Sequence, residues 1–289
     1  MPSLAAVCCH FNPCHYRRRV ANYAEFRRGI ERQGVRLLTV ELAFGEEPFE
    51  LPGDDIVRLR GGDVLWQKER LLQHGISLLL PEGHQAIAWL DTDIRFHDDT
   101  WMDNVLRALD HDVVVQCYDL VHRHDSDGDW TLPGIVSARH LGHLHATQGY
   151  AWAARREWLE TYGLYQHGVV GGADMILDAA CQFSSGVPRN TLETLSVFRH
   201  TSLAFRDHVF RWAARLRPTG VGYARNTIET MPHGARAERA YVERNHLLAE
   251  FDPDRDVRIG THGALEWSSD RPELHRGLRR YFESRREDS

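Results

Sequence analysis

Two carboxylates, Asp91 and Asp93, stand directly behind the apolar run 86–90. An apolar run of that length predicts a buried β-strand. In an extended chain residues i and i+2 project to the same side, so both carboxylates are expected to face one way where the strand ends. Open α/β sheets bind ligands at the carboxyl ends of their strands. Paired carboxylate oxygens at that place suit Mg²⁺ or Mn²⁺ carrying a diphosphate.

The Asp-x-Asp spacing alone predicts little, because the chain repeats it at Asp110 and Asp112 and again within 125–129 and 252–256. Those repeats lie in polar, turn-like stretches and are interpreted as solvated loop acids. The alternative for Asp91 and Asp93 is a strand-end pair that only caps the following turn. The hydrophobic strand that runs into them favours the metal site.

Further candidates lie next to glycine- or proline-containing turns. His233 precedes a predicted helix at 235–249, and its neutral imidazole is a candidate third metal ligand, although one of eighteen histidines is more often structural. Gly171 and Gly172 predict a turn that opens a helix and lets a ligand approach the backbone. Asp174, at the start of that helix, is a candidate general base for an acceptor hydroxyl, or a helix cap.

Two cations precede the strand that carries the carboxylates. Lys68 and Arg70 are candidates for neutralising phosphate oxygens. The alternative is a solvated helix face, and Glu69 weakens the positive field there. The three arginines at 17–19 have the same two interpretations.

The composition is that of a globular protein. The 289 residues are 42% hydrophobic and 26% charged, which allows a large core. No apolar stretch is long enough to cross a bilayer, and the first residues lack a signal-peptide pattern, so we expect a cytoplasmic protein without a membrane span. Five cysteines are expected as buried thiols rather than as disulfides or zinc ligands. The net charge of −6 gives no global attraction to nucleic acid, although arginines are frequent between 198 and 241 and form either a basic face or solvated helix exteriors.

Hydrophobic periodicity predicts alternating strands and helices in the first 120 residues. Strands are predicted at 4–10, 35–42, 56–59, 86–90 and 113–118, and helices at 20–30, 66–72 and 101–109. This order indicates an α/β fold, with a mixed, mostly parallel sheet flanked by helices. Farther along, 122–142 is predicted as a loop, 149–154 as a strand, and 202–216, 235–249 and 272–285 as helices. We expect a single compact unit, because no repeat or low-complexity linker interrupts the chain.

Taken together, these segments resemble the GT-A glycosyltransferases, metal-dependent enzymes that use nucleotide sugars, and in particular their galactosyltransferase-like branch. Trp-Leu-Asp-Thr-Asp-Ile at 89–94 is similar to the Asp-x-Asp strand of that family. Gly-Tyr-Ala-Trp-Ala from Gly149, followed by Gly-Gly-Ala-Asp up to Asp174, is similar to its donor-sugar strand and acceptor turn. His233 is similar to its late metal-binding histidine. The segments 10–13, 65–70 and 239–244 resemble bacterial and phage members, whereas Ala173 departs from the consecutive acids of the animal galactosyltransferases.

The resemblance implies a Rossmann-like GT-A fold, with a nucleotide-sugar-binding half at 1–120 and an acceptor-binding half with C-terminal helices at 121–289. It implies that Asp91, Asp93 and His233 hold Mn²⁺ or Mg²⁺. Asp174 would then be the base of an inverting transfer from a nucleotide-diphosphate sugar, expected to be a UDP-sugar. The donor-binding residues implied by the same segments are His10, Asn12, Lys68, Arg70, Asp91, Thr92, Gly149, Trp152, Gly171 and Gly172.

Several alternatives stay open at this point. A retaining mechanism would not need Asp174 as a base. The acceptor is a hydroxymethylated base in phage DNA in one hypothesis, and a glycan, lipid head group or protein in others. A non-catalytic nucleotide-sugar-binding protein and a nucleotide-sugar hydrolase are hypotheses of different classes.

Overall fold

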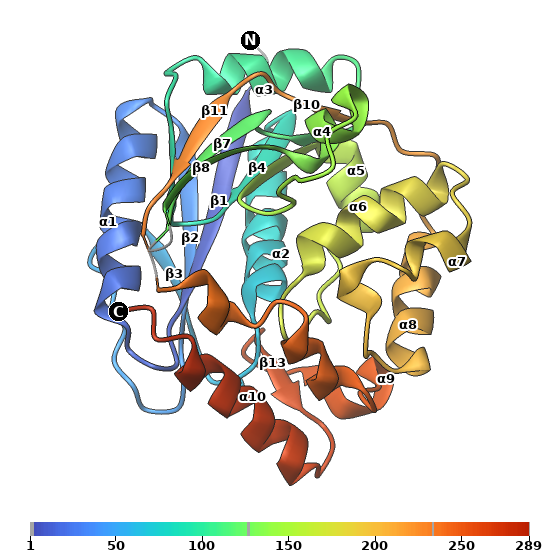
Figure 1. Cartoon of the computed structure of the whole chain (residues 1–289). Coiled ribbons are helices and arrows are strands. Elements are labelled where there is room, and N and C mark those ends of the chain that lie inside the picture. The colour runs from blue at the N-terminus through green and yellow to red at the C-terminus, as the bar shows by residue number, and fades with distance from the viewer. Residues whose placement is uncertain (1–2, 126–127, 233, 289) are drawn as a thin grey trace.

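A central sheet organises the chain. A computed structural model describes residues 3–125, 128–232 and 234–288. Its largest sheet has seven strands in the order β10-β6-β9-β4-β1-β2-β3 (Figure 1). Their bounds are β1 Leu4–Phe11, β2 Arg36–Ala43, β3 Ile56–Arg60, β4 Ala86–Leu90, β6 Val114–Gln116, β9 Ala151–Arg155 and β10 Val221–Tyr223. Neighbouring strands of this sheet are parallel except where β9 pairs with β4 and β6. The predicted mixed, mostly parallel α/β sheet is confirmed.

Helices cover both faces of this sheet. The helices α1 (Arg17–Arg32) and α3 (Trp101–Leu109) pack on one face. On the other face lie α2 (Lys68–Leu79), α5 (Arg156–Tyr162), α6 (Ala173–Ser184) and α8 (Leu203–Ala213). The short helices α4 (Ile135–Leu141) and α7 (Arg189–Leu192) extend that second layer. Strands from both halves of the sequence share one sheet, because β9 and β10 follow residue 120.

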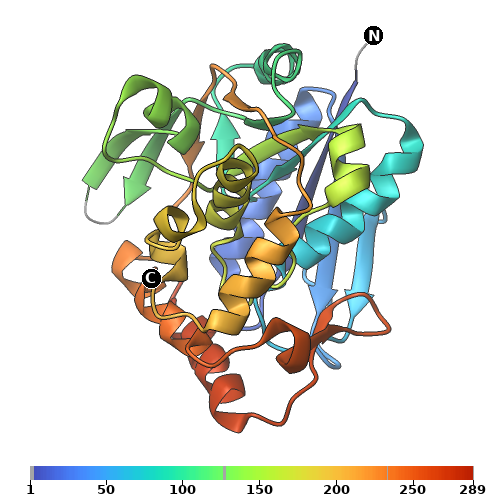
Figure 2. The same ribbon diagram turned by 90° about the vertical axis from the view of Figure 1, so that its right-hand side faces the viewer.

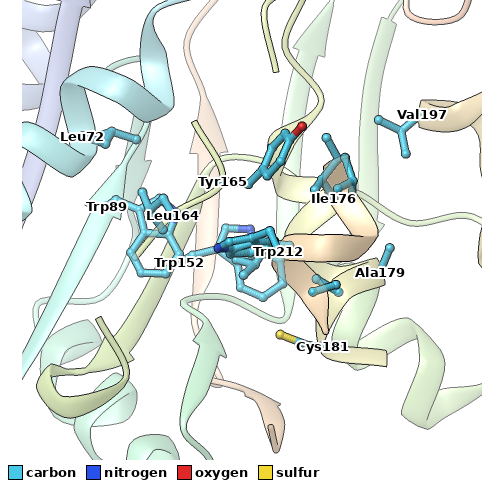
Figure 3. Packing of buried hydrophobic residues seen from close by; sticks show 14 of the residues in the cluster. Leu72, Trp89, Trp152, Leu164, Tyr165, Ile176, Ala179, Cys181, Val197 and Trp212 are labelled. Carbon is cyan, nitrogen blue, oxygen red and sulfur yellow. The ribbon is translucent and has the colours of Figure 1, made fainter. Parts of the chain in front are cut away.

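Side-chain alternation along the strands builds the two cores. In β1, Ala5 and Val7 face α2 and α6, whereas Ala6 and Cys8 face α1 and α3. Buried aromatic rings fill the first core, including Trp89 of β4, its cross-strand partner Trp152 of β9, and Trp212 of α8 (Figure 3). Helix α2 approaches β1 closely at Gly75, where a Cβ atom would lie 2.5 Å from Val7 Cγ2. A strand buried on both faces reads as the continuous apolar run that the sequence contains.

The prediction of a loop at 122–142 was wrong. The structure has two strands there, β7 (Leu120–Asp125) and β8 (Gly128–Pro133), followed by α4. They form a hairpin and join β5 (Ile94–Phe96) and β11 (Thr227–Thr230) in a second sheet of order β5-β11-β7-β8. The strands are polar because the hairpin projects into solvent (Figure 2). Cross-strand hydrogen bonds of 2.8 Å between His122 Nδ1 and Thr131 Oγ1 and between His124 Nδ1 and Asp129 Oδ1 join the two strands.

The C-terminal part returns to the N-terminal helix. The predicted helix at 235–249 is instead two 3₁₀ helices, η3 (Arg236–Arg239) and η4 (Glu243–Leu248). Next come α9 (Pro253–Asp256), the hairpin of β12 (Val257–Ile259) and β13 (Leu265–Trp267), and α10 (Pro272–Ser284). The residues after α10 lie beside the start of α1 (Figure 1), where the Asp288 carboxylate accepts hydrogen bonds from the backbone N–H groups of Arg17 and Arg18. The remaining 3₁₀ turns are η1 (Leu80–Glu82) and η2 (Ser196–Phe198).

All five cysteines are free thiols, and Cys8, Cys117 and Cys181 are buried. Burial raises the pKa of Cys8 to about 12. Within the described ranges, the structure contains no helix that combines the length and apolar character needed to span a bilayer.

Candidate active site

Asp91 and Asp93 follow β4 at its carboxyl end, as the sequence predicts. Backbone hydrogen bonds fix the turn on both sides: Asp91 N–H donates to Tyr150 O (2.7 Å), and Met231 N–H donates to Asp93 O (2.7 Å). Tyr150 has a φ of +80°, a conformation that costs energy for a residue with a side chain. The turn between β4 and β5 is therefore held by the segments that contain β9 and β11.

A cavity of about 500 Å³ opens beside this turn. Of the residues predicted to form a site, it is lined by Lys68, Asp91, Thr92, Asp93, Gly149, Gly172 and Asp174. These residues come from the first turn of α2, the end of β4, the segment before β9 and the start of α6. The structure thus brings together side chains that lie up to 106 positions apart in the chain.

The glycine turn before α6 places Asp174 at the cavity. Gly171 and Gly172 have φ angles of +87° and +89°, which glycine adopts without steric cost. The Asp174 carboxylate faces Gly149, where a Cβ atom would lie 3.7 Å from Asp174 Oδ2. That same oxygen accepts a hydrogen bond from Lys68 Nζ at 3.2 Å. The carboxylate is thus directed into the cavity toward the ammonium.

Lys68 connects the two groups of carboxylates. Its Nζ lies 2.6 Å from Asp91 Oδ1 and 3.2 Å from Asp174 Oδ2, and its side chain is only 11% exposed. Burial alone would lower the pKa of Lys68, but the Asp174 and Asp91 carboxylates outweigh it and raise that pKa well above its usual value. Burial raises the pKa of Asp91 to about 6, with Asp174 and Asp93 adding to the shift and Lys68 opposing it. The ammonium is therefore a permanent cation between two acids.

Lys68 is the only lysine in the chain. The other 34 of the 35 Lys and Arg residues are arginine. Lysine is a compact point charge, whereas arginine is a planar fork, so the two are not equivalent between two close carboxylates. This singular use of lysine was a signal in the sequence that would have separated Lys68 from its neighbours. Next to it, burial raises the pKa of Glu69 to about 8.

Five of the predicted donor-binding residues do not line this cavity, and one of them, Gly171, directly precedes the lining residue Gly172. Trp152 is buried among Trp89, Leu164 and Trp212 (Figure 3), and its indole N–H donates to Gln148 O at 2.7 Å. Arg70 donates to Gly263 O and to Gln166 Oε1, both at 2.6 Å. His10 and Asn12 lie in a smaller cavity of about 250 Å³ at the ends of β1 and β2.

Glu50 organises the smaller cavity. Its carboxylate lies 2.8 Å from His10 Nε2, from Asn12 Nδ2 and from His15 Nδ1. Burial opposes ionisation, but these three hydrogen bonds prevail and lower the pKa of Glu50 to about 2. Burial lowers the pKa of His10. His10 and Asn12 are thus both held by Glu50 at the carboxyl end of β1.

Sequence analysis named Arg19 as a phosphate candidate but missed Arg123, Arg285 and Glu287 in the wall of the larger cavity. Arg285 and Glu287, from the segment after α10, lie there with Arg19 of α1. The Glu287 carboxylate pairs with Arg19 Nη1 (3.1 Å) and Arg285 Nη2 (2.5 Å), and the Arg285 guanidinium lies 5.0 Å from the Trp66 ring centre. Arg123, Arg239 and Arg244 also line the cavity. Nothing in the local sequence connects Arg19 with residues 268 positions away.

Two of the three predicted metal ligands, Asp91 and Asp93, lie in the described part of the chain. His233 lies outside the described residues. Among those the structure does describe, no three His, Cys, Asp or Glu side chains are placed to hold one metal ion together. Mg²⁺ is commonly held by one or two carboxylates plus substrate phosphates, so Asp91 and Asp93 fit a cation that arrives with a diphosphate. The Lys68 ammonium lies 2.6 Å from Asp91 Oδ1, so a metal ion at this place would share that carboxylate with Lys68.

Comparisons with known proteins give only distant similarity. No family model and no curated protein matches the chain. One similar solved structure is glucosyl-3-phosphoglycerate synthase from Mycobacterium tuberculosis in complex with Mn²⁺, UDP and phosphoglyceric acid. The match has 10% sequence identity and a TM-score of 0.41, and it covers 86% of this chain and 77% of that chain. Another is a Drosophila β-1,4-galactosyltransferase 7 variant with manganese, UDP-Gal and xylobiose, at 12% identity, 94% and 97% coverage and a TM-score of 0.39. These structural neighbours are nucleotide-sugar transferases, and similarity at this level leaves the function of this chain to be inferred from its own site.

Proposed function

We propose that this protein is a GT-A-type glycosyltransferase that moves a sugar from a nucleotide-diphosphate sugar, a UDP-sugar, to an acceptor hydroxyl with a divalent cation. One observation carries the proposal. Asp91, Asp93 and Asp174 line a single cavity at the carboxyl end of β4, with Lys68 placed between Asp91 and Asp174. Two acids fit a metal–diphosphate complex, and a third acid, on a separate element, fits the acceptor.

Asp91 and Asp93 would hold Mn²⁺ or Mg²⁺, with His233 as the proposed protein ligand from the later segment. Bound there, the cation would neutralise negative charge on the departing diphosphate. The two carboxylates belong to one turn whose backbone is fixed at both ends, so they present their oxygens without a large rearrangement. Lys68 stays beside Asp91 and supplies a second positive charge for phosphate oxygens.

Asp174 is the proposed general base. Its carboxylate would take the proton of the acceptor hydroxyl while the acceptor oxygen forms a bond to the anomeric carbon of the sugar. The bond from that carbon to the diphosphate oxygen breaks, and the nucleoside diphosphate leaves with the bonding electron pair. Attack opposite to the leaving group inverts the anomeric configuration. Lys68 orients Asp174 through the 3.2 Å contact and keeps the base turned into the cavity.

The donor would extend over the sheet edge. In our proposal residues 1–120 bind the nucleotide sugar, with His10 and Asn12 directed by Glu50 in the neighbouring cavity. Thr92, Gly149, Gly171 and Gly172 would surround the sugar. Trp152 and Arg70 would act indirectly: Trp152 supports the strand under Gly149, and Arg70 ties α2 to the segment before β13. Residues 121–289 would supply Asp174 and the acceptor side.

The experiment compares Asp93→Asn with Asp103→Asn, an exposed acid on α3 that serves as the control. Calorimetric titration of UDP in the presence of Mn²⁺ is expected to show binding to the wild type and to the control, and a loss of at least about tenfold (1.4 kcal/mol) in the Asp93 variant. Products from a panel of UDP-sugars, with and without acceptors, separate the classes: transferred sugar indicates a transferase, free sugar a hydrolase, and intact donor a binding protein. Equal UDP affinity and turnover in wild type and Asp93→Asn would reject the proposal.

A further inference from the structure

One guanidinium in the cavity differs from the other cations. Arg244, in η4, has no carboxylate partner among the described residues, whereas Arg19 and Arg285 each pair with Glu287 and Lys68 pairs with two carboxylates. Its Nη1 donates to the Tyr281 hydroxyl at 2.9 Å. Its guanidinium carbon lies 5.1 Å from the ring centre of Tyr241 and 5.9 Å from that of Tyr281. The Nε atom is buried without a hydrogen-bond partner. Two aromatic rings thus hold a charge that has no counter-ion within the described part of the chain.

Arg244 lies on the Asp174 side of the cavity. A Cβ atom built on Gly171 would be 3.3 Å from Arg244 Nη1, and one on Gly172 would be 3.7 Å from Arg244 Nη2. The guanidinium therefore rests against the glycine turn that leads into α6, and Asp174 is two residues beyond that turn. A ligand group bound by Arg244 would be a neighbour of the hydroxyl that Asp174 is proposed to deprotonate.

The described wall of the cavity has more cationic than anionic side chains. Among the described residues its wall has six cationic side chains and four anionic ones: Arg19, Lys68, Arg123, Arg239, Arg244 and Arg285 against Asp91, Asp93, Asp174 and Glu287. A nucleotide-diphosphate sugar carries about one negative charge per phosphate. A divalent cation offsets those charges, so the positive excess of the wall remains. The acceptor is the component left to neutralise it.

We propose that Arg244 binds an anionic group, a phosphate or a carboxylate, on a small acceptor, and thereby selects acidic acceptors. This inference rests on the proposed glycosyltransferase function. Planar guanidinium groups bind both kinds of anion through paired N–H donors. A small acceptor is favoured over a nucleic acid because Arg244 lies in the wall of a cavity of about 500 Å³, a volume in the range of small-molecule sites.

The test uses the whole protein saturated with UDP and Mg²⁺, so that the donor site is filled. Methyl phosphate and acetate are then titrated as probes of the two anion types. One of them is expected to bind with a Kd on the order of 1 mM, as a single charge-assisted contact allows. Arg244→Gln is expected to weaken that binding at least tenfold and to leave UDP affinity within about twofold. Arg244→Lys keeps the positive charge but loses the paired N–H donors, so its affinity for the probe is expected to lie between those of the wild type and Arg244→Gln. Arg276→Gln, at an exposed position of α10, is the control.

Each result decides between defined alternatives. Binding of neither probe, or equal binding by wild type and Arg244→Gln, would overturn the assignment of Arg244. Competition between the probe and UDP would overturn it too, because Arg244 would then serve the donor. Salt-sensitive binding of a hydroxymethylated DNA duplex that is lost in Arg244→Gln would replace the small acceptor by a nucleic acid. Failure of UDP to bind the wild type in the first titration would instead reject the proposed function. Thermal melting of both Arg244 variants verifies that they are folded.

Discussion

Replacing Lys68 by methionine is expected to destabilise the protein because it removes the cation that separates Asp91 from Asp174. Methionine keeps a flexible, unbranched side chain of similar length, so packing changes little. The two carboxylates remain in the wall of the cavity, which Asp93, two positions after Asp91, also lines. Without the ammonium they repel one another in a place where water screens them poorly.

The size of the effect follows from burial. Breaking a fully buried ion pair by removing one partner costs about 3–5 kcal/mol. Here the side chains of Lys68, Asp91 and Asp174 are 11%, 25% and 18% exposed, so solvent relieves part of the cost. We expect a loss of about 2–3 kcal/mol in the free energy of unfolding, measured by urea denaturation of the metal-free protein. Arg276→Met on α10, whose side chain is 59% exposed, is the control and is expected to change stability by less than about 0.5 kcal/mol.

A second measurement separates charge from packing. Mn²⁺ without nucleotide is expected to raise the melting temperature of Lys68→Met more than that of the wild type, because the ammonium no longer competes for Asp91. Lys68→Arg is expected to recover only part of the stability, since a guanidinium fork does not fit where one nitrogen bridges two carboxylates. A loss below about 1 kcal/mol, or an equal response of wild type and variant to Mn²⁺, would refute the electrostatic role given to Lys68.

Three further predictions concern the frame and the metal. Glu287→Gln is expected to lower stability at pH 7 by up to about 3 kcal/mol, because Arg19 and Arg285 outweigh burial and lower the pKa of Glu287 to about 2 from an ordinary value near 4.3. This contribution is present above pH 4.3 and is lost as pH falls toward 2, so the difference between variant and wild type in urea denaturation should be about half as large at pH 3; a difference independent of pH would contradict it. Gly75→Ala is expected to cost about 1–3 kcal/mol in the same assay, since its Cβ would lie 2.5 Å from Val7 Cγ2, and unchanged stability would show that α2 can move outward. Mn²⁺ is expected to bind weakly alone and at least tenfold more tightly with UDP in calorimetry, because the Lys68 ammonium lies 2.6 Å from Asp91 Oδ1 and a diphosphate adds oxygen ligands of its own; equal affinities would contradict this role of the diphosphate.

Local sequence patterns predicted the elements whose hydrophobic spacing or glycine content is distinctive. The apolar run before Asp91 is a strand in the middle of the sheet and is buried on both faces. Its continuous apolar character and the acids at its end therefore predicted both the strand and the place of the carboxylates. The helix at Trp101–Leu109 was predicted to the residue because its apolar positions repeat at helical spacing. The glycines at 171 and 172 indicated a turn, and the structure gives both a positive φ.

Nonlocal pairing explains what the sequence did not predict. The β7–β8 hairpin has few apolar residues, and its strands exist because β11, more than 100 positions later, pairs with β7. Glu287 reaches the cavity only because Asp288 and Tyr16 fasten the end of the described chain to the start of α1. The chemistry of Lys68 likewise depends on Asp174, which local reading cannot place beside it.

Because Lys68 is the one lysine of the sequence, an amine-reactive reagent can modify the cavity at a single side chain. Acylating reagents attack uncharged side-chain amines, and Lys68 is the one such amine that this chain offers. The ion pairs with Asp91 and Asp174 raise the pKa of Lys68, so its ammonium seldom loses a proton and should react slowly. A ligand or ion that draws either carboxylate away would change that rate, so the speed of acylation at a single position would report occupancy of the cavity even before any sugar or acceptor has been identified.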